Sequence, residues 1–322
     1  MRNGLEIDRP RLDSAVSMGD SKYHWDHSNQ IRRFDQNSMP EQISVELSGH
    51  CNLNCLKCNI DDLKRPKGYM TRELYLKIIQ DETIGKIERL GLSNMGEPLM
   101  HKNLSEFVEL ADKTGKFKRI HITTNAILLN ERVSKRLLDA GLGGVKLSLD
   151  FLDRESYKKY NERDHFNKVV KNIQTFCDLK KQGRYNCDTM LKVTLYDYTE
   201  EVAQELIDRW KGYVDSIRIS NVHGWAGAER GNIPAEERKS PCQDLFCTLH
   251  ILHDGRVTLC CYDKEGYLSV ANIKDHSVAE MWKNHPRLNE IRQSHLDGDF
   301  SDLQMCRTCD SESYDDLVRY PD

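Results

Sequence analysis

Short apolar segments alternate with amphipathic segments along the chain from residue 43 onward. Six apolar segments have the pattern of strands that are buried on both faces of a parallel sheet. These predicted strands span 43–47, 87–92, 119–123, 144–149, 189–195 and 216–220. Between them, apolar residues recur at helical spacing, and several segments begin at a Thr, Asn or Asp that can cap a helix. The predicted helices span 71–84, 104–114, 131–140, 154–181 (as one helix or an interrupted one) and 199–212.

This alternation predicts an α/β fold on a parallel sheet, either an open doubly wound sheet or a curved barrel. Six βα units are two short of a closed barrel, which favours a (β/α)6 partial barrel with functional groups at the carboxyl ends of its strands. Gly, Pro and charged residues replace the pattern over 227–241, as in a linker. We therefore expect an N-terminal extension (1–42), a partial barrel (43–226) and a linker with a cysteine-rich domain (227–322).

The charge balance argues against two classes of partner. The 322 residues include 47 Lys and Arg against 51 Asp and Glu, a net charge of -4, so no overall basic excess favours nucleic acid or an anionic membrane. No apolar segment approaches the roughly 20 residues of a membrane span. The first 40 residues have no apolar core of a signal peptide. The sequence predicts a cytoplasmic protein.

Eleven cysteines are unusual for a reducing compartment, where dense thiols indicate metal binding or catalysis rather than disulfides. We expect Cys177 and Cys187 to be buried apolar residues. The other nine form two groups, first Cys51, Cys55 and Cys58, then Cys242, Cys247, Cys260, Cys261, Cys306 and Cys309.

The first group, Cys51-x3-Cys55-x2-Cys58, lies directly after the first predicted strand. Three thiolates can hold three irons of a [4Fe–4S] cluster and leave the fourth iron open to a substrate. A structural zinc site is the alternative, with His50 or a remote thiol as its fourth ligand.

The segment around these cysteines, 48–58, resembles the cluster loop of the radical S-adenosylmethionine (SAM) superfamily. The resemblance continues in order with 94–98 (Asn-Met-Gly-Glu-Pro), 123–126 and 148–150, each at the end of a predicted strand. Lys57 departs from the family, in which an aromatic or apolar residue near the adenine is common. The resemblance implies a (β/α)6 partial barrel that binds SAM on the open iron.

The resemblance also implies SAM-binding roles for particular residues. Gly96 and Glu97 match the motif that binds the methionine amino group, Asn125 follows the third strand, and Ser148 and Asp150 match the region that touches the ribose and methionine. Independently of the family, a carboxylate at Glu97 suits a ligand ammonium, and Gly96 allows close approach of the backbone. The alternative is that Gly-Glu-Pro forms only a turn.

The second half resembles the shortened SPASM, or twitch, domain of radical SAM enzymes. Its pattern is Cys242-x17-Cys260, a predicted hairpin turn at 253–257, and Cys306-x2-Cys309. The match implies that these four cysteines ligate one auxiliary [4Fe–4S] cluster, as in a cyclitol dehydrogenase of the same architecture. A four-cysteine zinc site is the alternative, although such sites usually show two C-x2-C pairs.

Two further residues are candidates for catalysis. If Cys260 faces the auxiliary cluster, strand alternation turns Cys261 away from it, either into the core or towards the barrel mouth, where its thiol could return a hydrogen atom to a substrate. Asp263 could orient a substrate hydroxyl or act as a base, or it could lie in a solvated turn. We expect further substrate contacts at late strand ends, among Tyr196, Asp197, Asn221, His223 and Trp225.

Together these features predict an enzyme with SAM and two [4Fe–4S] clusters as cofactors. The resemblance implies that it cleaves SAM to a 5′-deoxyadenosyl radical, which abstracts a substrate hydrogen, and that flavodoxin or ferredoxin supplies the electron. We expect oxidation of a secondary alcohol of a sugar or cyclitol-like small molecule, with the auxiliary cluster as electron acceptor. The alternatives are an epimerase with Cys261 as hydrogen donor, a peptide-modifying maturase, a non-catalytic redox carrier and a zinc-stabilised interaction protein.

Overall fold

One mixed sheet of ten strands organises the computed structural model, which describes residues 38–58, 60–195, 199–221, 238, 241–309 and 317–319. The strand order is β10-β6-β5-β4-β3-β2-β1-β7-β8-β9. The six central strands β1 to β6 follow one another in sequence order and are all parallel. They are the six strands that the sequence predicts, at β1 (Gln42–Val45), β2 (Ile87–Gly91), β3 (Phe117–Thr124), β4 (Gly144–Ser148), β5 (Asp188–Leu195) and β6 (Ser216–Asn221).

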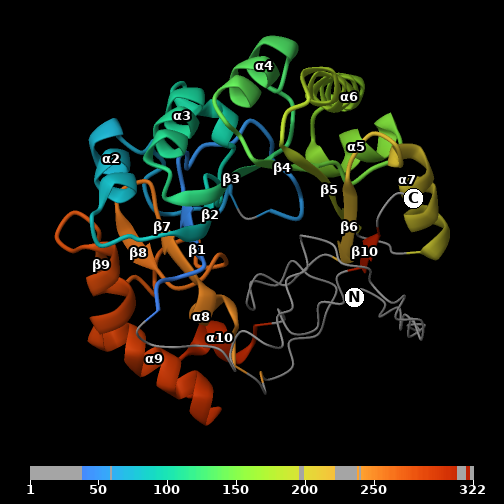
Figure 1. The fold of residues 1–322 in the computed structure, drawn as a ribbon. Helices are drawn as coiled ribbons and strands as arrows, with labels where there is room; N and C mark the ends of the chain where they lie inside the picture. The colour runs from blue at the N-terminus through green and yellow to red at the C-terminus, as the bar shows by residue number, and fades with distance from the viewer. Residues whose placement is uncertain are drawn as a thin grey trace, which may run out of the picture.

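Helices connect these strands and cover the outer side of the curved sheet (Figure 1). This arrangement is the α/β partial barrel that the sequence predicts. The expected helix over 154–181 is two helices, because the chain adopts a left-handed conformation at Glu162 (φ 56°) and a second helix starts after it. The connecting helices are α2 (Arg72–Gln80), α3 (Leu104–Thr114), α4 (Glu131–Asp139), α5 (Arg154–Asn161), α6 (Phe166–Gly183) and α7 (Glu200–Trp210), with a short η1 (Pro98–Met100).

Local sequence explains where these helices begin. Thr71, Asn130, Asp153 and Thr199 each accept a hydrogen bond from a backbone N–H of the first turn. Such side chains satisfy amide groups that have no partner inside the helix. The cap signals of the sequence therefore position the helices against the sheet.

The cysteine-rich part continues the sheet beyond β1. Strand β7 (Thr248–Ile251) pairs parallel with β1, and β8 (Arg256–Thr258) and β9 (Ala271–Asn272) follow antiparallel. The predicted hairpin turn is confirmed between β7 and β8, with Gly255 at a φ of 93°. The remaining elements are α8 (Asp244–Cys247), η2 (Glu280–Asn284), α9 (Pro286–Asp297), α10 (Gln304–Arg307) and, at the opposite edge beside β6, β10 (Leu317–Arg319).

The two faces of the barrel strands differ in chemistry. Leu147, Val193 and Ile219 are among the apolar residues that pack into the core and are at most 1% exposed. Because side chains alternate along a strand, polar residues between them face the concave side. The expected boundary at 226/227 falls outside the described residues. None of the described helices is long and apolar enough to span a membrane.

Candidate active site

The loop after β1 carries Cys51, Cys55 and Cys58, whose thiols are partly exposed and interact electrostatically across the loop. Burial raises the pKa of Cys51 to about 11 and also raises the pKa of Cys55. Because iron is bound by thiolates, ligation at this loop requires the thiols to release protons. Three thiols within one short loop fit the donor set for three irons of a [4Fe–4S] cluster.

Gly96 fits against the backbone of this loop. A Cβ atom at Gly96 would lie 2.1 Å from the carbonyl oxygen of Ser48 and 2.6 Å from that of His50. The next residue, Glu97, donates its backbone N–H to the His50 carbonyl at 2.8 Å. The close approach predicted for Gly96 is therefore present, and the backbone it approaches is that of the cysteine loop.

The carboxylate of Glu97 joins the ends of β2 and β3. It accepts hydrogen bonds from the Leu99 N–H (3.0 Å), the Thr124 hydroxyl (2.7 Å) and the Asn125 N–H (2.8 Å). The side chain is only 2% exposed, and burial raises its pKa to about 7. This contact set gives Glu97 a structural role at the strand ends. Its contact with a ligand ammonium stays a prediction.

Asn125 and Asp150 both contact the cysteine loop. The amide of Asn125 donates to Asn52 Oδ1 at 2.7 Å and lies 3.8 Å from Cys51 Sγ. Asp150 forms an ion pair with Lys57 and accepts the Thr194 N–H at 2.7 Å. Lys57, which stands where the family commonly has an aromatic or apolar residue, thus forms an ion pair with Asp150 in this chain.

Ser148, the remaining residue of this predicted set, lies on the concave face of β4. It is directly opposite Lys192 of β5 in the parallel register. Its side chain is partly exposed, so it can be reached from the barrel interior. Its contact with SAM stays a prediction.

The second cysteine group converges as the resemblance implies. Cys242, Cys260, Cys306 and Cys309 line one pocket together with Arg238 and His295, among other residues. Four thiols around one pocket fit the donor set of a closed [4Fe–4S] cluster. Within the described residues, no three His, Cys, Asp or Glu side chains converge on a position for a single metal ion.

Two thiols of this region have different surroundings. Cys260 and Cys261 lie beyond the end of β8 at Thr258, so the strand alternation that was expected to turn Cys261 away from the auxiliary cluster does not apply to them. The Cys261 thiol lies beside the Cys260 thiol and raises the pKa of Cys260, which burial raises further. The Cys261 side chain is exposed and lies beside Asp244, whose pKa it helps to lower. Its role as a hydrogen donor stays a prediction.

Asp263 is 1% exposed, so the expectation of a solvated turn is wrong. Its carboxylate accepts hydrogen bonds from the Thr258 hydroxyl and from the N–H groups of Tyr267 (2.8 Å) and Leu268 (2.7 Å). These bonds use much of the capacity of a carboxylate. Asp263 is therefore a structural residue of this loop, and its expected contact with substrate is without support.

A carboxylate–imidazole pair lies beside Cys261, and its carboxylate is a residue that the sequence did not single out. Asp244 Oδ2 is 2.8 Å from His250 Nε2, and the Asp244 side chain is 32% exposed. Burial alone would raise the pKa of Asp244, but the charge and hydrogen bond of His250 lower it below its usual value. The pair can accept a proton. In the sequence, the position of Asp244 two residues after the predicted ligand Cys242 was the signal that could have indicated it.

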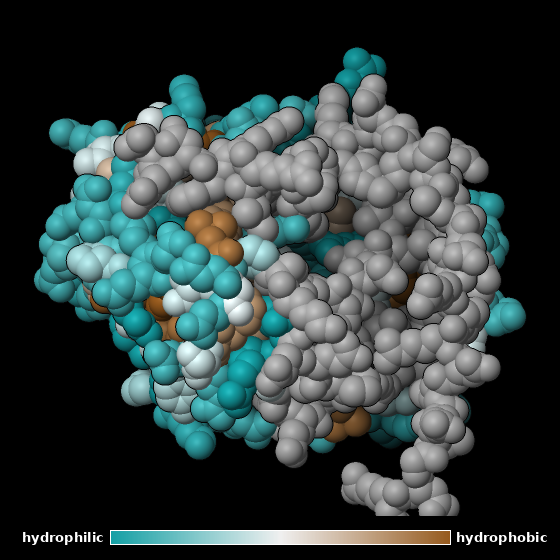
Figure 2. Space-filling view, turned by 90° about the horizontal axis from the view of Figure 1, so that it is seen from below, coloured by the Kyte–Doolittle hydropathy of each residue, from teal (hydrophilic) through white to brown (hydrophobic). Residues whose placement is uncertain are grey.

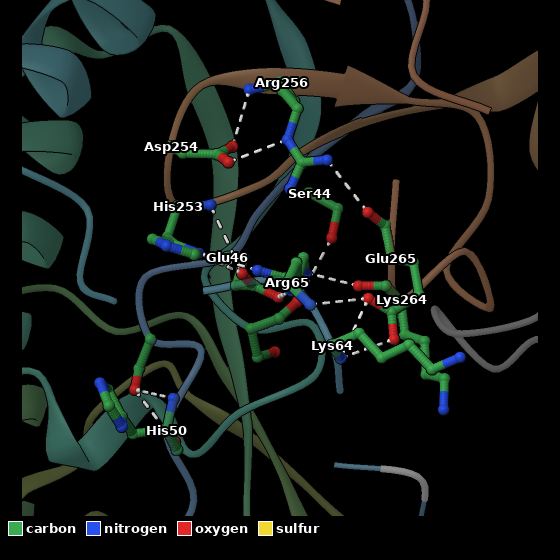
Figure 3. A network of polar contacts seen from close by, with 12 residues as sticks. Ser44, Glu46, His50, Lys64, Arg65, His253, Asp254, Arg256, Lys264 and Glu265 are labelled. Atoms are coloured by element: carbon green, nitrogen blue, oxygen red, sulfur yellow. Dashed lines mark hydrogen bonds and ion pairs between the residues drawn. The ribbon is translucent and has the colours of Figure 1, made fainter. Parts of the chain in front are cut away.

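A buried polar network joins the cysteine loop to the cysteine-rich part (Figure 3). Arg65, which follows the first cysteines, donates from Nη2 to Glu46 Oε2 at 2.6 Å, and both side chains are at most 4% exposed. His253 Nδ1 lies 2.8 Å from Glu46 Oε1 and 3.0 Å from Arg65 Nη1. Glu265 accepts the N–H groups of Lys64 and Arg65, both at 2.9 Å. The network fixes the two cysteine-bearing regions to each other.

Comparison with known proteins identifies this architecture. The chain belongs to the radical SAM superfamily, whose family model matches residues 45–217, more than half of the chain. A second model, an iron–sulfur cluster-binding domain called SPASM, matches residues 242–310. The radical SAM match implies SAM and a [4Fe–4S] cluster as cofactors, and the SPASM match implies auxiliary iron–sulfur chemistry.

Individual relatives cover parts of the chain. A probable GTP 3′,8-cyclase of Methanothermobacter thermautotrophicus is 33% identical over 140 residues, which is 42% of this chain and 44% of the relative. The chain thus spans less than half the length of that relative. Two solved structures share the fold: BtrN in complex with AdoMet and 2-DOIA (TM-score 0.59, 18% identity, 85% of this chain, 94% of BtrN) and Streptococcus suis SuiB bound to precursor peptide SuiA (0.66, 14%, 89%, 75%).

Replacing Arg65 by Met tests the network. The change leaves the Glu46 carboxylate buried without its main charge partner, which costs about 3–5 kcal/mol in the free energy of unfolding. Urea denaturation of the reconstituted protein measures the loss. Arg72→Met, at an exposed ion pair with Glu106, serves as the control and costs less than about 1 kcal/mol. Equal losses in the two variants would contradict the assignment.

Replacing Gly96 by Ala tests the packing of the cysteine loop. The added methyl overlaps two backbone carbonyls, so we expect a loss of about 1–3 kcal/mol and reduced iron at the first cysteine group. Gly85→Ala is the matched control, because a Cβ atom there meets nothing within 4 Å. Iron analysis and denaturation of both variants check this, and a Gly96→Ala protein that matches Gly85→Ala in both would show that the approach is unimportant.

Proposed function

We propose that this radical SAM enzyme oxidises a secondary alcohol of a small polar substrate, such as a sugar or cyclitol. The observation that supports the proposal most directly is that the partly exposed Asp244 carboxylate lies close to the second cysteine group. Cys260 lines the four-cysteine pocket, and the adjacent Cys261 is exposed and lies beside Asp244. A substrate held at Asp244 would therefore lie beside Cys261, whose neighbour in the chain, Cys260, lines the auxiliary site.

The cofactors supply the redox chemistry when they are bound: one cluster gives the electron that cleaves SAM, and the auxiliary cluster accepts one electron from the substrate. The protein contributes position and proton transfer. In this proposal Cys51, Cys55 and Cys58 hold the first cluster, and Cys242, Cys260, Cys306 and Cys309 hold the second.

Asp244 and His250 are the groups that we assign to the substrate hydroxyl. Oxidation of an alcohol to a ketone removes a hydrogen atom from carbon, a proton from oxygen and one electron. The Asp244–His250 pair is suited to accept the proton, since its carboxylate is partly exposed and hydrogen-bonded to an imidazole. Bound SAM would supply the deoxyadenosyl group that takes the hydrogen atom, and a cluster held by the second cysteine group would take the electron.

An epimerase is the second candidate, because Cys261 presents an exposed thiol at the same place. Such a thiol could return a hydrogen atom to the substrate carbon on the face opposite to the one from which hydrogen was abstracted. The curated relatives named as GTP 3′,8-cyclases favour a cyclisation instead, although they match only part of this chain. A peptide substrate is a further alternative. In each case we expect flavodoxin or ferredoxin as electron donor and a cytoplasmic location.

Substitution of the first three cysteines tests the cluster assignment. Replacing Cys51, Cys55 and Cys58 by Ala should reduce the iron content of the reconstituted protein from about eight to about four per chain and abolish 5′-deoxyadenosine formation, given two four-iron clusters. The buried Cys177→Ala variant is the control and should keep both. Iron that stays at the wild-type level in the triple variant, or continued SAM cleavage, contradicts the assignment.

Turnover in heavy water separates the proposed reactions. Sugars and cyclitols that stimulate 5′-deoxyadenosine formation are identified first, and their products are then analysed by mass spectrometry. For oxidation we expect a product lighter by two hydrogens and without carbon-bound solvent deuterium. Asp244→Asn should slow this reaction about 10²-fold or more, because it removes the proton acceptor.

Other products point to other functions. A product of otherwise unchanged mass with one carbon-bound deuterium, lost in Cys261→Ala, would establish the epimerase, since a thiol proton exchanges with solvent. An isomer without solvent deuterium would indicate cyclisation. Either result would overturn the proposed oxidation.

A further inference from the structure

The concave face of strands β4, β5 and β6 carries a group of cations. Lys146, Lys192 and Arg218 occupy positions between core residues of these strands, so they face the barrel interior. Lys192 is directly opposite Arg218 in the parallel register. All three side chains are only partly exposed. Seen from below, hydrophilic atoms lie at the floor of the central hollow, with some hydrophobic ones beside them (Figure 2).

This placement is unfavourable for folding alone. Like charges directly opposite each other destabilise a sheet, and partial burial of a cation adds a desolvation cost. Burial, together with Arg218, Lys192 and Arg89, lowers the pKa of Lys146 to about 7. Burial, Lys57 and Arg218 lower the pKa of Lys192 to about 8. An anion bound between these side chains would remove the repulsion.

The nearby carboxylates are engaged elsewhere. Asp150 pairs with Lys57 and accepts the Thr194 N–H, and Asp244 pairs with His250. Among the described residues, no hydrogen bond or ion pair joins either Lys146 or Lys192 to a carboxylate. The carboxylates that act electrostatically on these lysines, Asp244 and Asp150, are therefore already paired with His250 and Lys57.

The cations also lie between the two cysteine regions. Lys192 interacts electrostatically with Lys57 of the first cysteine loop and with Cys261 beside the second group. Lys146 interacts with Asp244, the proposed proton acceptor. A molecule held here would be within reach of both sites. The position therefore indicates a substrate contact rather than a surface patch.

We propose that Lys146, Lys192 and Arg218 bind an oxyanion of the substrate, so that the small polar substrate carries a phosphate or carboxylate group. This inference rests on the proposed function, because it assigns a substrate class to the same site. Two ammonium groups and a guanidinium provide charge-assisted hydrogen bonds to such an oxyanion. The anionic group would hold the substrate on the β4–β6 side while its alcohol carbon faces Asp244.

Calorimetric titration of the full-length reconstituted protein with inorganic phosphate or succinate, at low ionic strength and without oxygen, tests this site. We expect at least one of the two anions to bind the wild type. Lys192→Gln should weaken binding about tenfold or more, because it removes a charged hydrogen-bond donor, and Lys192→Arg should retain most of it. The control Lys168→Gln removes an exposed lysine on the outer helix α6 and should bind like the wild type.

Thermal denaturation gives a second measurement. Phosphate or succinate, whichever binds, should raise the midpoint of wild type and Lys168→Gln but not of Lys192→Gln. Binding of phosphate alone assigns a phosphorylated substrate, binding of succinate alone a carboxylated one, and binding of both supports the site for either group. Absence of binding by both anions, or equal binding to Lys192→Gln and wild type, overturns the proposal.

The same wild-type preparation separates this inference from the proposed function. SAM cleavage is measured from the 5′-deoxyadenosine formed with a chemical reductant. Failure to bind either anion, with SAM cleavage intact, defeats only the oxyanion site. Failure to cleave SAM in a protein that binds the anion defeats the proposed function and leaves the cationic site established.

Discussion

The buried carboxylate of Glu46 is the interaction on which the arrangement of the two cysteine regions depends. It lies just after β1 and is completely buried, which is unfavourable for a carboxylate unless charge and hydrogen bonds compensate it. Arg65 from the first cysteine loop and His253 from the β7–β8 turn supply that compensation. Burial would raise the pKa of Glu46, but these two partners together hold it below its usual value. The carboxylate thus requires both regions to be in place.

This constraint gives the continuous sheet a functional meaning. Strand β1 pairs with β2 of the barrel on one side and with β7 on the other, so the second cysteine region is an extension of the barrel rather than a loosely attached unit. Electron transfer and radical chemistry both need fixed distances between cofactors and substrate. The pairing and the Glu46 network fix the positions of the two cysteine regions through backbone hydrogen bonds and buried charge.

The charges in the barrel interior are arranged differently from those around Glu46. At Glu46, opposite charges are matched inside the protein, whereas Lys192 and Arg218 face each other with like charge. In the proposed site an anionic ligand compensates this repulsion, in keeping with the tendency of functional sites to depart from what favours folding. The proposed proton acceptor Asp244 and the exposed thiol of Cys261 border the same region. The residues that we propose for proton transfer and for anion binding therefore lie on one face of the sheet.

The sequence by itself determined the elements and the cysteine groups, because strand burial, helix caps and ligand spacing are local properties. All six barrel strands and the β7–β8 hairpin were predictable in this way, as was the close approach of the backbone at Gly96. Only the tertiary structure decided the roles of Glu97 and Asp263, whose carboxylates bind backbone amides and hydroxyls of the protein itself. The same holds for the Asp244–His250 pair and the juxtaposition of Lys192 with Arg218. Hydrogen-bond partners and charge neighbours come from strands and loops far apart in the chain, and spacing along the sequence does not encode which of them meet.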